Sequence, residues 1–148
     1  EVVKEKKIHT LWFEAHYMYR KKLASFAEQF APAKVKFRCG VETFDTALRE
    51  TWKKGIPSSV SVQDIAQHFQ GICLLCCTQG ETKEHILKDI ELAKAHFEYF
   101  SVNVFCENHT PMKQDKELAS WFAREVYPMI KDDPRIEVLM ENTDLGVG

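Results

Sequence analysis

The segment ICLLCCTQGET, residues 72–82, decides the predicted fold. Residues 72–77 are nearly all apolar, which is the pattern of a strand buried on both faces in a parallel sheet. A polar turn follows, and Thr82 is placed to cap a long helix in which Ile86 and Phe97 lie on one face. A buried strand, a short turn and a long helix indicate one unit of a parallel α/β fold.

Apolar runs and stretches of helical periodicity alternate on both sides of this unit. The predicted strands cover residues 8–15, 35–39, 72–77, 101–106 and 136–140. Helices are expected between them, beginning at caps such as Asp45 and Ser61. Because strand and helix take turns along the chain, we predict an α/β fold with about five parallel strands.

Composition is that of an ordinary globular protein of one domain, residues 1–148. Hydrophobic residues make up 45% of the 148 and charged residues 28%, and the net charge is -2. Lysines and arginines are scattered rather than clustered, which argues against a nucleic-acid partner. No apolar run is long enough for a membrane span and no signal peptide opens the chain, so a cytoplasmic protein is expected.

The five cysteines, at positions 39, 73, 76, 77 and 106, do not suggest a secreted disulfide framework. Cys73 and Cys76 have C-x-x-C spacing, but side chains three apart in a strand point to opposite faces. We therefore expect buried thiols and no metal site. The chain opens without Met on a charged lead-in, and it is expected to be a fragment of a longer protein.

Polar clusters follow each predicted strand. They contain Glu14 and His16 after the first strand, residues 40–43 after the second, 78–82 after the third, 107–110 after the fourth and 141–144 after the last. Turns are commonly polar, but ligands of parallel α/β folds bind at the carboxyl ends of strands. Five such clusters together favour a small-molecule pocket at that edge.

Three segments in this order resemble the radical S-adenosylmethionine (radical SAM) superfamily. They are GVETFDTALRETWKKGI at residues 40–56, ICLLCCTQGET at 72–82 with Gln79 where Pro is usual, and NVFCENHTP at 103–111. The resemblance spans about residues 35–111 and implies the C-terminal portion of a partial, or half, TIM-type barrel.

The resemblance also implies site residues. Glu42 and Thr43 would contact the ribose of S-adenosylmethionine, and Lys54 would meet its methionine carboxylate. Backbone near Gly71 and the turn of Thr78, Gln79 and Gly80 would lie along the adenine and methionine parts. A possible substrate pocket would contain Glu14, His16, Asn108 and Asn142, with Asp144 a further guess.

The family's C-x-x-x-C-x-x-C motif, which holds a [4Fe-4S] cluster, is absent from this chain. The resemblance implies that missing N-terminal sequence holds the cluster in the full-length protein. That protein would cleave S-adenosylmethionine to a 5'-deoxyadenosyl radical, which abstracts hydrogen from an unknown substrate. The fragment alone would be inactive.

Two other readings of the residues remain open. Glu14, His16, Glu107 and His109 could form the His/carboxylate metal site of an α/β hydrolase or lyase. Alternatively, the chain could be a non-catalytic interaction domain that dimerises through its open sheet edges. Large aromatic side chains are expected in the core or against helices, namely those of Trp12, Phe13, Trp121 and Phe122.

Overall fold

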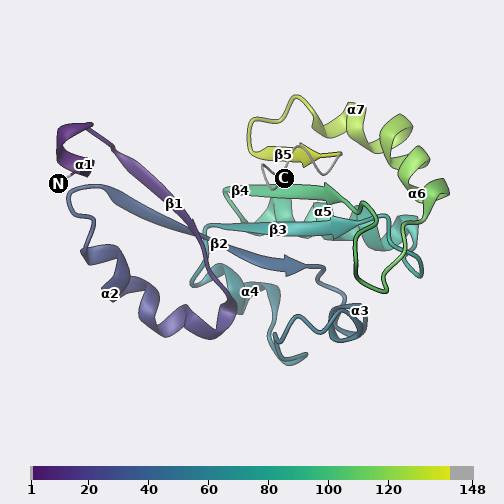
Figure 1. The fold of residues 1–148 in the computed structure, drawn as a ribbon, viewed down its shortest axis with the longest axis horizontal. Helices are drawn as coiled ribbons and strands as arrows, with labels where there is room; N and C mark the ends of the chain where they lie inside the picture. Colours follow the sequence, from purple (N-terminus) through teal and green to yellow (C-terminus); the bar gives the residue numbers. More distant parts are fainter. Residues whose placement is uncertain (1, 141–148) are drawn as a thin grey trace.

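Five parallel strands pair in the order in which they occur along the chain (Figure 1). The computed structural model describes residues 2–140. The strands are β1 Thr10–Glu14, β2 Lys34–Glu42, β3 Gly71–Cys76, β4 Tyr99–Val104 and β5 Ile136–Leu139. Together they form a half barrel, which confirms the predicted α/β class and the partial TIM-type architecture.

Helical segments connect the strands. They are α1 Val2–Glu5, the 3-10 helix η1 Tyr17–Lys22, α2 Leu23–Glu28, α3 Thr46–Thr51, α4 Val62–Ala66, α5 Lys83–His96, α6 Lys116–Trp121, the π-helical turn η2 Phe122–Val126 and α7 Tyr127–Ile130. The expected caps are present, because Asp45, Ser61 and Thr82 each accept a backbone N–H in the first turn of α3, α4 and α5.

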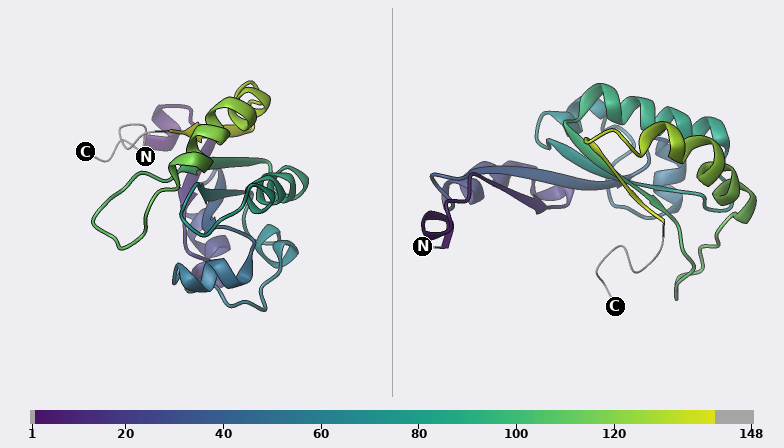
Figure 2. Two further views of the ribbon diagram at one scale, coloured as in Figure 1. Left: turned by 90° about the vertical axis from the view of Figure 1, so that its right-hand side faces the viewer. Right: turned by 90° about the horizontal axis from the view of Figure 1, so that it is seen from above.

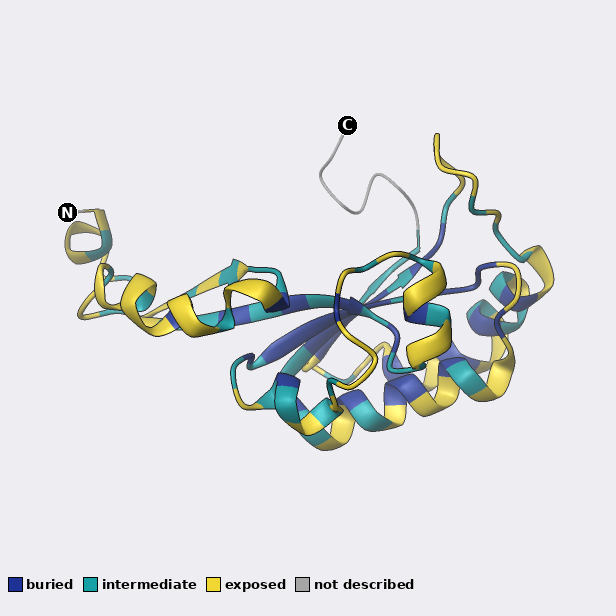
Figure 3. Ribbon diagram, turned by 90° about the horizontal axis from the view of Figure 1, so that it is seen from below, coloured by how far each residue is buried: buried dark blue, intermediate teal, exposed yellow. Residues whose placement is uncertain are grey.

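One face of the sheet, here called the outer face, is apolar and covered by helices (Figure 2). Strand residues such as Phe37, Ile72, Leu74 and Phe100 point to this side and are buried against helix residues such as Ile90. Figure 3 shows the buried positions concentrated in the strands and on the inward sides of the helices. This layer is the hydrophobic core, which provides most of the favourable free energy of folding.

The opposite, inner face carries polar and aromatic side chains. Arg38 on β2 lies between Glu14 on β1, at 3.3 Å, and Glu137 on β5, at 3.6 Å. Tyr99 donates its hydroxyl hydrogen to Glu137 at 2.9 Å, and its ring lies 5.7 Å from that of Trp12. The sheet therefore has a covered apolar face and a charged face that no described helix covers.

Trp12 corrects one prediction. Its side chain was expected in the core, but it lies on the inner face and is 42% exposed. The ring packs over Gly71, where an added Cβ would come within 3.1 Å of it. Phe122, in contrast, is fully buried as expected.

The C-terminal helix corrects a second prediction. The spacing of Leu118, Phe122, Val126 and Met129 predicts that all four share one buried helix face, but Met129 is 65% exposed and Ile130 is buried instead. The π-helical turn at residues 122–126 inserts an extra residue, which shifts every later side chain around the helix axis. Pro128 follows this turn in α7 without ending the helix. No described helix is long and apolar enough to cross a membrane.

Candidate functional site

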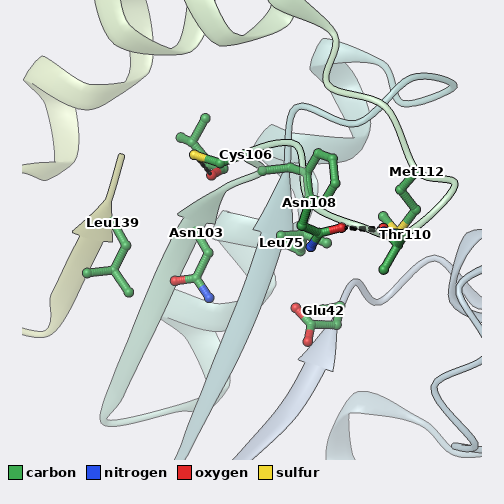
Figure 4. Close-up of a pocket in the computed structure, with 10 residues that line it drawn as sticks. Glu42, Leu75, Asn103, Cys106, Asn108, Thr110, Met112 and Leu139 are labelled. Atoms are coloured by element: carbon green, nitrogen blue, oxygen red, sulfur yellow. Dashed lines mark hydrogen bonds between the residues drawn. The ribbon is translucent and has the colours of Figure 1, made fainter. Parts of the chain in front are cut away.

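A cavity of about 240 Å³ opens at the carboxyl ends of the strands (Figure 4). Glu42 from β2, Leu75 from β3, Asn103 from β4 and Leu139 from β5 lie on its wall, and loop residues between β4 and α6 line the other side. Parallel pairing of neighbouring strands brings these ends to one edge, here called the rim. The segment GVET covers the end of β2 and QGET follows the adjacent strand β3, so both lie at the rim.

Glu42 is held at the rim by an unusual backbone and an ion pair. Its φ of 69° lies in the left-handed region, which a non-glycine residue rarely adopts, and the ladder to β3 shifts register beside it. The Lys54 ammonium donates to Glu42 Oε1 at 2.8 Å. The other carboxylate oxygen, Oε2, has no partner among the described residues and can accept hydrogen bonds from a ligand.

His16 joins the same group from the end of β1. Its Nε2 donates to the Lys54 carbonyl oxygen at 2.7 Å, while Nδ1 accepts from Met18 N at 3.1 Å. The two partners fix the tautomer that carries the hydrogen on Nε2. His16 therefore holds the backbone of Lys54, and the structure brings together three residues that are far apart in sequence.

Asn103 supplies a polar group that the sequence did not indicate. Its Oδ1 is buried and has no hydrogen-bond partner among the described residues. Figure 4 shows its amide on the same side of the sheet as the Glu42 carboxylate. An unpaired buried carbonyl oxygen is unfavourable by about 1–3 kcal/mol, so a ligand donor at this position would be stabilised.

Thr43 does not reach the rim. Its side chain is fully buried, its Oγ1 accepts from Asp45 N at 3.1 Å, and its hydroxyl also interacts with the buried carboxylate of Asp89. The contact between Thr43 and a ribose stays a prediction, and in this structure the Thr43 side chain makes its contacts inside the turn. Only Glu42 of this pair faces the cavity.

The other residues expected to bind the cofactor lie at opposite ends of β3. Gln79 and Gly80 are exposed in the turn after β3, whereas Thr78 is buried and donates its backbone N–H and hydroxyl to Glu81. Gly71 begins β3, at the end of the strand opposite to the rim. Gly71 serves the packing of Trp12 rather than the rim cavity.

The possible substrate residues lie at different heights on the inner face. Asn108 lines the cavity and accepts hydrogen bonds from Thr110. Glu14 lies deeper, paired with Arg38, and one of its oxygens is 3.8 Å from the position of a Cβ on Gly40. Asn142 and Asp144 lie outside the described residues.

The alternative metal site of Glu14, His16, Glu107 and His109 is not assembled. Both ring nitrogens of His16 have backbone partners, and Glu107 is exposed near Lys113 at 3.8 Å. Within residues 2–140, no group of three or more His, Cys, Asp or Glu side chains is placed to hold a metal ion.

The cysteines behave as separate thiols. Cys73 points to the inner face, where it lies beside Ser101, and Cys76 points into the core. Burial raises the pKa of Cys39 to about 12 and that of Cys73 to about 11, so both stay protonated near neutral pH. These side chains do not suit a [4Fe-4S] cluster, which needs several thiolates around one point.

Comparison with known proteins identifies the family. No family model and no curated protein matches the chain. Among solved structures, it is similar to a queuine lyase from Clostridium spiroforme bound to SAM and queuine, with 36% sequence identity and a TM-score of 0.91. This similarity bears out the resemblance to the radical SAM superfamily.

The match covers 99% of this chain and 63% of the queuine lyase chain, so the chain spans less than two thirds of the lyase's length. The described part of the chain contains a half barrel and one rim. The resemblance based on GVET and QGET is thus confirmed over a longer stretch than the residues that suggested it.

Several rim residues escaped the sequence reasoning. They are Leu75, Asn103, Cys106, Met112 and Leu139 on the cavity wall, and Asp89 beneath the turn after β2. For Asn103 a signal existed, because it is a polar residue inside a predicted apolar strand region. For Asp89 the signal was a charged residue on the apolar face of α5, beside Ile86 and Ile90.

Proposed function

We propose that this chain forms the SAM-binding half of a radical SAM enzyme whose [4Fe-4S] ligands lie outside residues 1–148. The observation that carries the proposal is the match to a SAM-bound queuine lyase, together with the Glu42–Lys54 pair beside the rim cavity. The chain is then the C-terminal portion of a barrel in a longer protein.

Each rim group has a role that suits SAM. The free Oε2 of Glu42 accepts from the ribose hydroxyls, and the ammonium of Lys54 turns toward the methionine carboxylate. Asn103 Oδ1 accepts a hydrogen bond from an amino group of the ligand. Opening the Glu42–Lys54 pair is inexpensive, because both side chains are partly exposed and such pairs contribute about 0–1 kcal/mol.

A [4Fe-4S] cluster held by sequence outside residues 1–148 would supply the electron for reductive cleavage of SAM. The contribution of this chain is binding, orientation and exclusion of water. His16 fixes Lys54 through its backbone carbonyl, and Leu75 and Leu139 give the cavity apolar walls that suit a neutral reacting carbon.

We further propose that the substrate is queuine or a related 7-deazapurine base. Support comes from the 36% identity to a lyase that has queuine bound. The inner face offers acceptors for the amino and N–H groups of such a base in Glu14 and Glu137, and aromatic surface in Trp12 and Tyr99. A homodimer joined at the open strand edges is also part of the proposal.

The test uses a longer form of the protein that includes the cluster-binding sequence. After anaerobic reconstitution, we expect iron–sulfur absorbance, release of 5'-deoxyadenosine from SAM, and loss of queuine in coupled assays. The Glu42→Gln and Lys54→Met variants should raise the Kd for SAM about tenfold each, since each loses one charge-assisted hydrogen bond.

Glu107→Gln is the matched control. The Glu107 side chain is exposed, and its ion pair with Lys113 is long, at 3.8 Å. It should bind SAM like the wild type. Absence of SAM cleavage by the reconstituted protein would overturn the proposed reaction, whereas SAM cleavage without consumption of queuine would overturn only the substrate.

A further inference from the structure

We infer that two buried carboxylates, Asp89 and Glu81, are positioning residues that hold the two turns of the SAM rim in their binding conformation. The inference rests on the proposed function of the rim. Neither side chain lines the rim cavity, so neither is offered as a ligand of SAM.

The turn after β2 is held by Asp89. Asp89 lies on α5 and is only 6% exposed. Its Oδ1 accepts the backbone N–H of Phe44 at 2.9 Å, and the Thr43 hydroxyl is near enough to interact with the same carboxylate. These are the two residues that follow Glu42, so Asp89 fixes the backbone immediately after the left-handed residue.

The turn after β3 is held by Glu81 in the same way. β3 ends before Cys77, whose φ of 66° is again left-handed. The next residue, Thr78, donates its backbone N–H to Glu81 Oε2 at 2.6 Å and its hydroxyl to the same oxygen at 2.9 Å. Adjacent strands thus share one device, in which the turn after a left-handed residue donates a backbone N–H to a buried carboxylate.

The device explains how the rim keeps strained backbone at two positions. A non-glycine residue in the left-handed region is unfavourable by about 1–3 kcal/mol and persists only when its surroundings determine it. Hydrogen bonds to a carboxylate are stronger than those to a neutral acceptor and supply this determination. Asp89 accepts the Phe44 amide in the first turn, and Glu81 accepts the Thr78 amide and hydroxyl in the second. Without them, Glu42 would relax and its carboxylate would leave the cavity.

Burial of these carboxylates is unfavourable for folding, which supports a role beyond stability. Desolvation raises the pKa of Glu81 to about 7 and raises that of Asp89 above its ordinary value, although the hydrogen bonds oppose the shift. Apolar side chains of similar size would fill the same space without this penalty. They could not accept the turn's N–H and hydroxyl groups.

The test measures SAM affinity and amide exchange in the full-length, reconstituted protein. Asp89→Ala should raise the Kd for SAM about tenfold, the equivalent of about 1.4 kcal/mol, and should speed hydrogen exchange at the Phe44 amide. Asp89→Asn retains one carbonyl oxygen and should recover part of both effects. Glu81→Ala should act likewise on the Thr78 amide.

Glu91→Ala is the matched control on the exposed side of α5, and it should leave affinity and Phe44 exchange unchanged. If Asp89→Ala does not fold, Thr43→Val can replace it. This variant removes only the hydroxyl and should change the Kd for SAM and Phe44 exchange in the same direction by a smaller amount. A folded Asp89→Ala protein with wild-type Kd and wild-type Phe44 exchange would overturn the inference. If the wild type itself does not bind SAM, the proposed function fails, and Phe44 exchange still decides whether Asp89 holds the turn.

Discussion

The two faces of the sheet are made by the same strands and yet follow different rules. On the outer face, residues such as Phe100 and Val102 pack against helices and are almost fully buried. On the inner face, their neighbours on β4, Tyr99 and Asn103, carry polar groups toward a cavity or an ion pair. The comparison shows that one strand can supply the hydrophobic core on one side and a polar cavity wall on the other, because its side chains alternate.

The largest effect is expected from emptying the outer face. Phe100→Ala should lower the free energy of unfolding by about 3–5 kcal/mol, because a fully buried ring leaves a cavity in the core. Urea denaturation checks this value. Tyr99→Phe, the adjacent inner-face residue, is the control and should lose only the hydrogen bond to Glu137, about 0.5–1.5 kcal/mol. Equal losses of unfolding free energy in Phe100→Ala and Tyr99→Phe would show that the two faces contribute alike to stability.

The free energy of unfolding should depend on pH because the Glu81 carboxyl group is buried. The pKa of Glu81 is raised by burial from 4.5 to about 7, so the folded state holds this proton more tightly than the unfolded state. The contribution of protonated Glu81 to the free energy of unfolding is therefore fully present below pH 4.5. It is lost as the pH rises to about 7, which lowers the free energy of unfolding by about 3 kcal/mol.

Glu81→Gln removes this titration while keeping a carbonyl acceptor. The difference in unfolding free energy between wild type and variant, measured by denaturation at several pH values, should change by about 3 kcal/mol across that window. Glu84→Gln, at an exposed position of α5, should give no such slope. A flat difference for Glu81→Gln would show that the carboxylate is solvated in the folded protein.

The smallest effect separates two glycines of the inner face. An added Cβ at Gly71 would lie 2.8 Å from the Tyr99 carbonyl oxygen and 3.1 Å from the Trp12 ring, so Gly71→Ala should destabilise the fold by about 1–3 kcal/mol. At Gly40 the nearest atoms are carboxylate oxygens at 3.7 Å and 3.8 Å, and Gly40→Ala should change stability by less than about 0.5 kcal/mol. Thermal unfolding distinguishes the two, and a reversed order would contradict the packing of Trp12 over Gly71.

Hydrophobic patterning was sufficient for the outer face and for the order of the elements. The apolar run at residues 72–77 and the caps at Asp45 and Thr82 report local preferences, and all are present in the structure. Periodicity could not reveal that Trp12 packs over a glycine 59 positions later, or that a π-helical turn moves Met129 outward. Those outcomes depend on neighbours in space, which one sequence does not display.

The rim was predicted in outline and incompletely in detail. Glu42 and Lys54 do meet, and His16 joins them, because the strand ends converge. Thr43, next to Glu42, turns inward because Asp89, on a helix that follows another strand, offers a buried acceptor. A motif indicates which turn to consider, but the partner beneath the turn decides which of its side chains faces outward.

The unbranched strand order, β1 to β5, also bears on how the protein opens. Each strand pairs only with its immediate neighbours along the chain, so the sheet resembles a short one-dimensional array. Loss of β1 or β5 breaks one ladder, whereas loss of β3 breaks two. Backbone amides of β3 should therefore exchange slowest with solvent, and local unfolding should advance from both margins toward the strand that precedes QGET.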